Sequence, residues 1–260
     1  MYNFQYANPT RVCFGEGQIA RLPELIPAGS RLLVLYGGGS IKQNGVYEQL
    51  TQALAGREWL EFPGIGANPQ YDQLMEAVAL VKRERIDFLL AVGGGSVVDG
   101  TKFVAAAACF EGADPWEILL HKAPVKAALP LGCVLTLPAT GSESNPAAVV
   151  SRGEAKLSFY NPLVLPRFAV LDPTTTYSLP VRQVGNGVVD AFVHILEQYL
   201  TFPVGGDVQD RLAEGLLQVL VDNGPRALTE PTNYQVRANL MWAASLALNG
   251  LIGRGVPQDW

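Results

Sequence analysis

The sequence predicts an α/β fold, in which a doubly wound parallel sheet is followed by an all-helical domain. Short apolar runs alternate with helical patterns along the first part of the chain. These runs are continuously apolar, which is typical of parallel strands covered on both faces. From Pro180 onward we find only helical patterns. We therefore expect a domain boundary near residue 179, with an α/β domain over 1–179 and a helical domain over 180–260.

The elements are expected in a regular order. Buried strands are predicted at 31–36, 57–62, 86–92, 131–138 and 168–173. Helices are predicted from the first glycine run to about Ala55, over the amphipathic stretch 70–85, and from the second glycine run to about Phe110. The segments 147–152 and 155–160 are candidates for a small antiparallel excursion. Three further helices are predicted at 180–201, 207–222 and 233–252, separated by FPVGG and DNGPRALTEPTN.

Composition excludes several classes of protein. The chain has 260 residues, 48% of them hydrophobic and 17% charged, which supports a large globular core. Its net charge is −5 and its basic residues are not clustered, which argues against nucleic acid or an anionic membrane surface as a partner. We see no secretion signal and no run of membrane-spanning length. The three cysteines, Cys13, Cys109 and Cys133, lack CxxC spacing and are expected as buried core thiols in a cytoplasmic protein.

Two glycine runs each follow a predicted strand and precede a helix. They are Gly37, Gly38, Gly39 and Ser40, and Gly93, Gly94, Gly95 and Ser96. A strand, a glycine turn and a helix can form an anion site, because a phosphate can approach bare amides at the positive end of the helix. The alternative is an ordinary tight turn. Two such runs at the carboxyl ends of parallel strands favour a ligand site.

Neither run matches a standard nucleotide fingerprint. The pattern G-x-G-x-x-G fails because Lys42 and Val98 occupy the positions of the last glycine. The P-loop pattern is nearly met at 95–100, but Thr101 and Lys102 are in reversed order, which rotates the lysine by about 100° around the helix. Ser96 and Asp99 are also spaced for a capping box, and this does not exclude a ligand role for Asp99.

Two further groups of polar residues interrupt apolar runs. The stretch LTLPATGSESN leaves a predicted strand and carries Thr136, Thr140, Ser142 and Ser144, whose hydroxyls suit ribose or phosphate oxygens. In VVDAFVHILEQYL, the only polar residues from 188 to 196 are Asp190 and His194. They share one face of a helix that is expected to be buried. This pair is either a buried ion pair or part of a divalent metal site.

Taken in order, these groups resemble the iron-dependent (group III) alcohol dehydrogenase family, which includes glycerol dehydrogenase and dehydroquinate synthase. The matching stretches are RVCFGEG, YGGGS, AVGGGSVVDGTKF, LTLPATGSESN, VLDP, NGVVDAFVHILEQY and MWAASLALNGLIGRGVPQDW. They extend over the whole chain and are closest to the NADPH-dependent aldehyde reductase, or butanol dehydrogenase-like, branch of enteric bacteria. The resemblance implies a dehydroquinate synthase-like α/β domain and a nicotinamide cofactor in a cleft beside the helical domain.

The resemblance also assigns roles to individual residues. It implies that Gly93, Gly94, Gly95 and Ser96 bind the cofactor pyrophosphate. It places Asp99, Thr136, Thr140, Ser142 and Lys156 on the ribose and nicotinamide side. It makes Asp190 and His194 the catalytic residues and the first two ligands of Fe(II) or Zn(II), a choice of donors that suits either ion. Such a metal would polarise the carbonyl oxygen of a small aldehyde for hydride transfer.

The first glycine run predicts the choice of cofactor. Relatives that prefer NAD usually carry an acidic residue where Gly39 stands, and a carboxylate repels a 2′-phosphate. Here Gly39 leaves room, Ser40 can donate a hydrogen bond, and Lys42 adds positive charge. We therefore expect NADP(H).

One feature departs from the family pattern. The family completes its metal site with two more histidines beyond VPQDW, whereas this sequence has only His121 and His194 and ends at Trp260. We therefore expect only half of the metal site here, without the C-terminal portion of the family, and Glu197 or Asp259 as candidate substitute ligands. Exposed apolar surface is expected on 207–222 and 233–252, together with self-association. A homodimer is possible, with the N-terminal segment as an edge strand.

Two functions of different class follow from the sequence. The first is a metal-dependent NADP(H) aldehyde reductase. The second is a nucleotide-binding module that binds NADP(H) without catalysis, because two metal-ligand histidines are missing. A P-loop-like phosphotransferase is disfavoured by the reversed order of Thr101 and Lys102.

Overall fold

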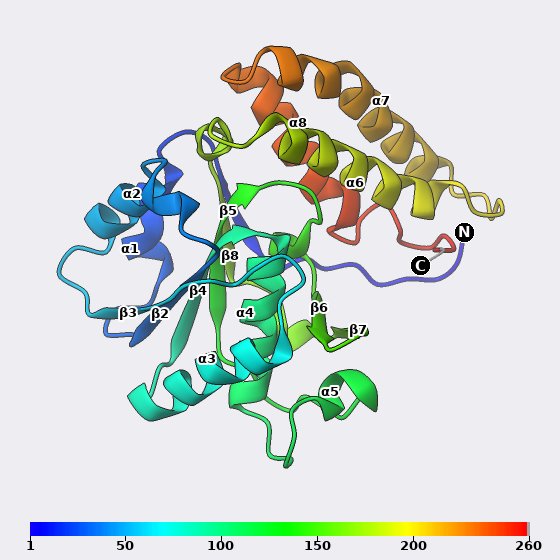
Figure 1. Cartoon of the computed structure of the whole chain (residues 1–260). Coiled ribbons are helices and arrows are strands. Elements are labelled where there is room, and N and C mark those ends of the chain that lie inside the picture. The colour runs from blue at the N-terminus through cyan, green and yellow to red at the C-terminus, as the bar shows by residue number, and fades with distance from the viewer. Residues whose placement is uncertain (259–260) are drawn as a thin grey trace.

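A computed structural model of the chain describes residues 1–258, and its centre is a six-stranded parallel sheet (Figure 1). The strands follow the order β1-β8-β5-β4-β2-β3. Every pair of neighbouring strands is parallel. Their bounds are β1 Arg11–Phe14, β2 Leu32–Tyr36, β3 Trp59–Phe62, β4 Phe88–Gly94, β5 Leu131–Leu137 and β8 Phe168–Leu171. The predicted doubly wound α/β architecture is therefore confirmed.

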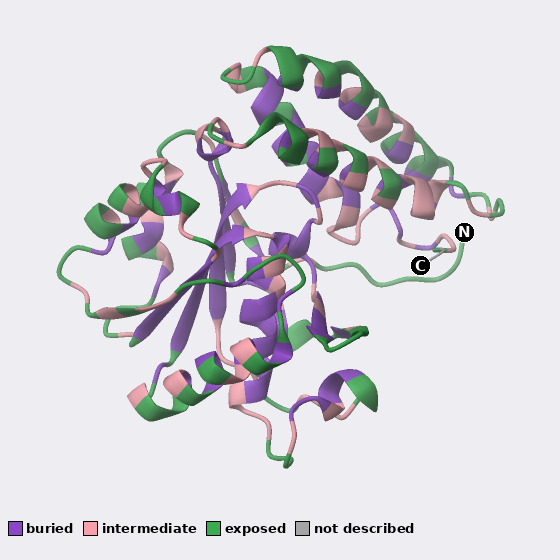
Figure 2. Cartoon of the chain, viewed as in Figure 1, coloured by how far each residue is buried: buried purple, intermediate pink, exposed green. Residues whose placement is uncertain are grey.

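Helices cover both faces of the sheet, and the period of two along each strand decides which side chain meets which layer. Leu33, Leu89 and Cys133 face the layer of α3 (Tyr71–Glu84) and α4 (Gly95–Ala108). Leu32, Leu90 and Val134 face the opposite layer, which contains α1 (Leu22–Leu25) and α2 (Val46–Ala53). Figure 2 shows the sheet as the most continuously buried part of the molecule. Burial on both faces explains why the strands read as unbroken apolar runs.

The small excursion predicted after β5 is an antiparallel hairpin of β6 (Ala147–Arg152) and β7 (Ala155–Tyr160). It is followed by β8, and a short helix, α5 (Glu117–Leu120), contacts β7. Ser151 N donates to Pro69 O at 2.9 Å, which ties the hairpin to the segment before α3. The hairpin thereby forms a wall beside the carboxyl end of β4.

The last part of the chain is helical, as expected. It contains α6 (Val181–Tyr199), α7 (Asp207–Thr229) and α8 (Tyr234–Leu248), which enclose a third apolar core around Ala191, Leu220 and Leu240. The sheet ends at Leu171 and α6 begins at Val181, so the proposed boundary near 179 falls between them. The division into two domains remains a prediction.

Three details differ from the expectations. Helix α7 does not stop near 222 but continues through Asn223, Gly224 and Pro225. Most of α8 is buried, with Trp242 exposed, so the expected apolar surface lies mainly on α7, at Val208, Leu212, Val221 and Leu228. The N-terminal segment forms an edge strand within this chain's own sheet, because β1 pairs with β8.

The two ends of the described chain lie close together (Figure 1). Tyr2 N donates to Gly255 O at 2.8 Å, and Asn8 Nδ2 donates to the carbonyls of both Ser144 and Asn249. Among residues 1–258, no helix is both long enough and apolar enough to span a bilayer. The cysteines are free, with Cys13 and Cys133 buried and Cys109 half-buried.

Candidate functional site

The two glycine runs lie side by side at the carboxyl edge of the sheet. Strands β2 and β4 are neighbours, and their register pairs Tyr36 with Val92, the residues that precede Gly37 and Gly93. The turn after β5 lies on the other side of β4. In open α/β sheets, ligands bind at this edge.

A cavity of about 330 Å³ opens at this edge, between α4, the turn after β5 and the β6–β7 hairpin. Six of the residues predicted to bind the cofactor line it: Gly95, Ser96, Asp99, Thr140, Ser142 and Lys156. His194 of α6 also lines it. The cavity therefore brings the predicted cofactor residues and one predicted metal ligand to the same space.

The remaining predicted cofactor residues do not line this cavity. Gly93 and Gly94 are the last two residues of β4, and Thr136 is in β5 and almost buried. Gly37, Gly38, Gly39 and Ser40 follow β2. At Gly38 and Gly39 a Cβ would meet no atom within 4 Å, and Gly39 has a φ of +94°. The first glycine run therefore leaves open space where the 2′-phosphate of NADP(H) is predicted to bind.

The second glycine run is shaped by close packing. A Cβ on Gly95 would lie 2.3 Å from Thr140 Oγ1, and one on Gly93 would lie 2.6 Å from Val97 Cγ2. These glycines let the turn after β5 and the first turn of α4 approach each other. The interpretation as a tight turn thus holds at these two positions, and it places the start of α4 against the cavity.

The N-terminus of α4 has the features of an anion site. Gly94 is its N-cap, no side chain caps it, and its first turn contains no acidic residue. Its first amides are therefore not satisfied by a side chain of the helix, and the helix dipole adds partial positive charge there. The start of α4 at Gly95 also makes the expected Ser96–Asp99 capping box wrong, because Ser96 lies inside the helix.

Asp99 makes contacts that are distant in sequence. Its Oδ1 accepts a hydrogen bond from Ser142 Oγ at 2.5 Å, and its Oδ2 accepts one from Val149 N at 3.0 Å. Burial raises the pKa of the Asp99 carboxyl, against the opposing effect of Lys102. Asp99 therefore connects α4, the turn after β5 and the β6–β7 hairpin around the cavity.

Lys102, to which the sequence patterns assign no role once the P-loop is disfavoured, lies at the centre of a buried network. Its Nζ donates to Ser142 Oγ at 2.8 Å, to Asn145 Oδ1 at 3.2 Å and to Ala147 O at 2.7 Å. Burial lowers the pKa of Lys102 to about 8, although Asp99 and Glu143 oppose this shift. One sequence feature indicates this role: Lys102 is a lone lysine directly before the apolar stretch Phe103–Ala108. A lysine in such a stretch is expected to be buried, and a buried lysine needs partners.

Glu143 is a second residue that the sequence patterns did not predict, and it joins the turn after β5 to α8. Its side chain is 1% exposed and Oε1 accepts a hydrogen bond from Ser245 of α8. Burial raises the pKa of the Glu143 carboxyl. In the sequence, Glu143 is one of several polar residues in a turn. Only its contact with Ser245 of α8 distinguishes it from a solvent-exposed glutamate.

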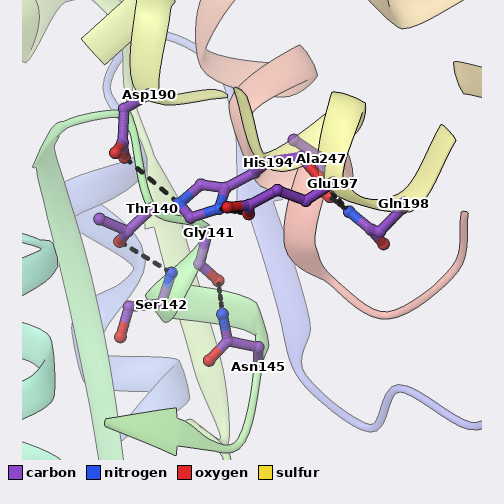
Figure 3. A network of polar contacts seen from close by, with 9 residues as sticks. All are labelled: Thr140, Gly141, Ser142, Asn145, Asp190, His194, Glu197, Gln198 and Ala247. Atoms are coloured by element: carbon purple, nitrogen blue, oxygen red, sulfur yellow. Dashed lines mark hydrogen bonds and ion pairs between the residues drawn. The ribbon is translucent and has the colours of Figure 1, made fainter. Parts of the chain in front are cut away.

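Asp190 and His194 lie one turn apart on α6 with their side chains directed toward each other (Figure 3), and His194 lines the cavity. Asp190 Oδ2 is 3.5 Å from His194 Nε2. The expectation that this helix is buried all round is wrong, because Val189 and Val193 are 61% and 43% exposed. One side of α6 packs on α7 and α8, and the opposite side faces outward. The pair is therefore half-buried.

The atoms of this pair fit a divalent cation. Asp190 Oδ2 is buried and has no hydrogen-bond partner among the described residues. Two ligand atoms about 2.1 Å from a tetrahedral metal are about 3.4 Å apart, close to the separation of Asp190 Oδ2 and His194 Nε2. The carboxylate of Asp190 raises the pKa of His194, and Glu197 adds a smaller effect in the same direction. An imidazole and a carboxylate suit iron or zinc.

The structure does not support Glu197 as a substitute ligand. Its Oε2 contacts the other ring nitrogen of His194, Nδ1, at 3.3 Å. Among residues 1–258, no cluster of three or more His, Cys, Asp or Glu side chains is arranged to hold a metal ion. The other candidate, Asp259, lies outside the described residues. His121 is distant in the fold, on the end of α5, where its Nδ1 contacts Glu117 at 2.5 Å.

Comparison with known proteins shows the family. Residues 9–173 match the model of iron-containing alcohol dehydrogenases, and residues 185–255 match the C-terminal model of the Fe-containing alcohol dehydrogenase family. The chain belongs to the iron-containing alcohol dehydrogenase family. The resemblance inferred from the motifs is thereby confirmed, and this family consists of oxidoreductases.

Individual members of the iron-containing alcohol dehydrogenase family match the whole chain. The NADPH-dependent aldehyde reductase YqhD of Escherichia coli is 60% identical, and the match covers 100% of this chain and 68% of that protein. The probable NADH-dependent butanol dehydrogenase 1 of Bacillus subtilis is 43% identical, with the same two coverages. This chain therefore spans about two thirds of the length of these relatives.

Solved structures of the family agree with this fold. The crystal structure of Escherichia coli YqhD matches with a TM-score of 0.98 and 59% identity, covering 100% of this chain and 67% of that one. The NADH-dependent butanol dehydrogenase A of Thermotoga maritima matches with a TM-score of 0.94 and 40% identity, covering 100% and 66%. The α/β architecture is thus the one that these family members share.

Proposed function

We propose that this chain is an NADP(H)-dependent, metal-dependent aldehyde reductase that acts on small aldehydes and the corresponding alcohols. One observation carries the proposal: a single cavity is lined both by the uncapped N-terminal turn of α4 and by His194 of α6. Cofactor phosphates and a metal-bound substrate oxygen need these two kinds of group near each other. The 60% identity to an NADPH-dependent aldehyde reductase supports the same reaction.

The residues of the chain have separate tasks in this proposal. The amides at Gly95 and Ser96 bind the cofactor pyrophosphate, and the helix dipole stabilises its charge. Lys156, exposed on β7, supplies positive charge across the cavity from α4. Leu248 and Ala148 line the cavity with apolar surface that excludes water. When bound, Fe(II) supplies a Lewis acid for the carbonyl oxygen and NADPH supplies the hydride.

Asp190 and His194 hold the metal in this proposal, with Fe(II) favoured over Zn(II) by the character of the family. We expect Asp190→Ala and His194→Ala to lower aldehyde-dependent NADPH oxidation by at least about 100-fold, because each removes one ligand. Binding of NADPH should be unchanged, since neither substitution touches the turn before α4. The assay is run with added Fe(II) or Zn(II), and the metal content is measured by elemental analysis.

The second candidate is a module that binds NADP(H) without catalysis. It is favoured because no cluster of three or more His, Cys, Asp or Glu side chains among residues 1–258 is arranged to hold a metal ion. The same assay separates the two functions. Tight NADPH binding without turnover at any metal concentration would establish the module and exclude the reductase for this chain.

The choice of cofactor is tested at the first glycine run. We expect the wild-type chain to bind NADPH more tightly than NADH, because the open space at Gly38 and Gly39 admits a 2′-phosphate beside Ser40. Lys42 contributes less than its charge indicates, since its Nζ already contacts Glu61 Oε2 at 3.0 Å. Fluorescence titration of both cofactors measures the preference, and tighter NADH binding contradicts it.

A matched pair of variants isolates the charge effect. Gly39→Asp and Gly39→Asn impose the same backbone strain at a φ of +94° and differ by one charge. The aspartate variant should bind NADPH at least about 10-fold more weakly than the asparagine variant, because like charges repel. NADH binding should differ little between the two.

The expected homodimer and cytoplasmic location remain predictions. Strand β1 is at the edge of the described sheet, so one side of this strand has no neighbouring strand there. Such an edge is suited to pairing with a second copy.

A further inference from the structure

We propose that Glu197 is a positioning residue that holds the imidazole proton of His194 on Nδ1 and thereby keeps Nε2 as a metal-ligand atom. The proposal rests on the proposed function, because it assigns His194 to a metal. It concerns a residue whose side chain lies on the far side of the imidazole from Asp190, as Figure 3 shows.

The spacing of three residues on α6 creates this arrangement. Asp190, His194 and Glu197 stand at positions i, i+4 and i+7, so they follow one face of the helix. Asp190 Oδ2 approaches Nε2 at 3.5 Å, and Glu197 Oε2 approaches Nδ1 at 3.3 Å. The imidazole is therefore placed between two carboxylates, one at each ring nitrogen.

The two contacts are not equivalent. Glu197 Oε2 and Nδ1 are within hydrogen-bond distance at 3.3 Å, whereas Asp190 Oδ2 and Nε2 form a longer ion-pair contact at 3.5 Å. A neutral imidazole carries one N–H, and the acceptor beside one nitrogen decides which nitrogen keeps the lone pair. Glu197 therefore favours a proton on Nδ1 and a lone pair on Nε2, where Asp190 Oδ2 supplies the second ligand atom.

The backbone near His194 is also fixed. Gln198 Nε2 donates to His194 O at 2.6 Å and to Ala247 O at 2.8 Å, which ties this turn of α6 to α8. The side chain of His194 is 20% exposed. With the backbone anchored, the Glu197 and Asp190 carboxylates act on opposite nitrogens of the imidazole. Removing Glu197 leaves Asp190 as a carboxylate that draws the proton to Nε2, where it blocks metal binding.

The tautomer is directly measurable, because the chain contains only His121 and His194. Long-range ¹H–¹⁵N NMR on the ¹⁵N-histidine-labelled chain reports which ring nitrogen is protonated, at a pH where both imidazoles are neutral. We expect Nδ1–H at His194 in the wild type. Glu197→Ala should shift the proton to Nε2, and Glu197→Gln, whose amide oxygen still accepts, should retain Nδ1–H. A wild-type His194 protonated on Nε2 overturns the proposal.

Metal affinity supplies a second readout. Titration with Zn²⁺ or Co²⁺ should show binding that is about 10- to 100-fold weaker in Glu197→Ala than in the wild type. Glu117→Ala is the matched control, because it removes the carboxylate beside Nδ1 of His121 and leaves α6 untouched. It should leave metal affinity unchanged. Circular dichroism checks that each variant is folded, and Glu197→Gln carries the test if the alanine variant is not.

The outcomes separate this inference from the proposed function. A wild-type chain that binds no metal but carries the proton on Nδ1 contradicts the metal-dependent function and leaves the tautomer assignment supported. A wild-type chain that binds metal as tightly as Glu197→Ala, with the same tautomer in both, overturns the positioning role alone.

Discussion

Replacing Lys102 by methionine is expected to lower the free energy of unfolding by about 3–5 kcal/mol. Methionine keeps most of the aliphatic length of the side chain but donates no hydrogen bond. Ser142 Oγ, Asn145 Oδ1 and Ala147 O would lose their common donor. The buried carboxyls of Asp99 and Glu143 would lose their nearby cation, and an uncompensated buried charge is costly. Equilibrium unfolding in urea measures the change.

Lys156→Met is the matched control. Lys156 lines the same cavity but is exposed on β7, so its replacement should change the stability by less than about 0.5 kcal/mol. If Lys102→Met and Lys156→Met lost equal stability, the buried Lys102 would contribute no more to folding than the exposed Lys156, which contradicts the prediction.

The pH dependence of stability in the wild type and in Lys102→Met gives a further check on the burial of Lys102. Lys102 has its pKa lowered from 10.5 to about 8, so between these values the unfolded chain binds more protons than the folded chain. The free energy of unfolding therefore rises with pH in this window, by at most about 1.4 kcal/mol per pH unit from this group. Subtracting the Lys102→Met curve from the wild-type curve isolates this rise from other titrating groups.

Replacing Gly187 by alanine is expected to destabilise the chain by about 1–3 kcal/mol and to reduce turnover about 100-fold. A Cβ there would lie 2.5 Å from Pro138 O, a backbone atom at the start of the turn that carries Thr140 and Ser142. The helix α6 must move away, and Asp190 and His194 move with it relative to α4.

Gly185→Ala is the control on the same helix. Its Cβ would meet only Leu228 at 3.9 Å, so alanine should raise the free energy of unfolding by up to about 1 kcal/mol through its better helix propensity. Chemical denaturation and the aldehyde assay are applied to both variants. A Gly187→Ala protein as stable and active as Gly185→Ala would show that α6 tolerates this approach.

Much of the architecture follows from local patterns. The runs at 31–36, 86–92 and 131–138 correspond to β2, β4 and β5, because a strand covered on both faces carries apolar residues at every position. The amphipathic stretch 70–85 corresponds to α3, because its apolar residues recur at helical spacing. The hairpin at 147–160 has the predicted strands and pairing.

Other elements depend on distant contacts. The stretch DNGP reads as a break, yet α7 continues through it. Gly224 lies where a Cβ would be 2.9 Å from Val188 Cγ1, so the glycine serves close packing of α7 on α6 rather than the end of a helix. The burial of α6 was overestimated for a related reason. Helix α6 has more apolar residues than α7, α8 and the sheet can cover. How many of them are covered depends on where the other helices lie.

For the candidate site, the sequence by itself determined the two local arrangements on which the proposed phosphate and cation sites depend. A glycine turn between a strand and a helix, and an Asp and a His one helical turn apart, are set by covalent spacing and helix geometry. Only the tertiary structure decided the partners of these groups. Asp99 bonds to Ser142 and Val149, Lys102 lies among three acceptors, and Glu143 meets Ser245, contacts that span 40 or more residues of sequence. Such contacts depend on how the elements pack, so no local pattern encodes them.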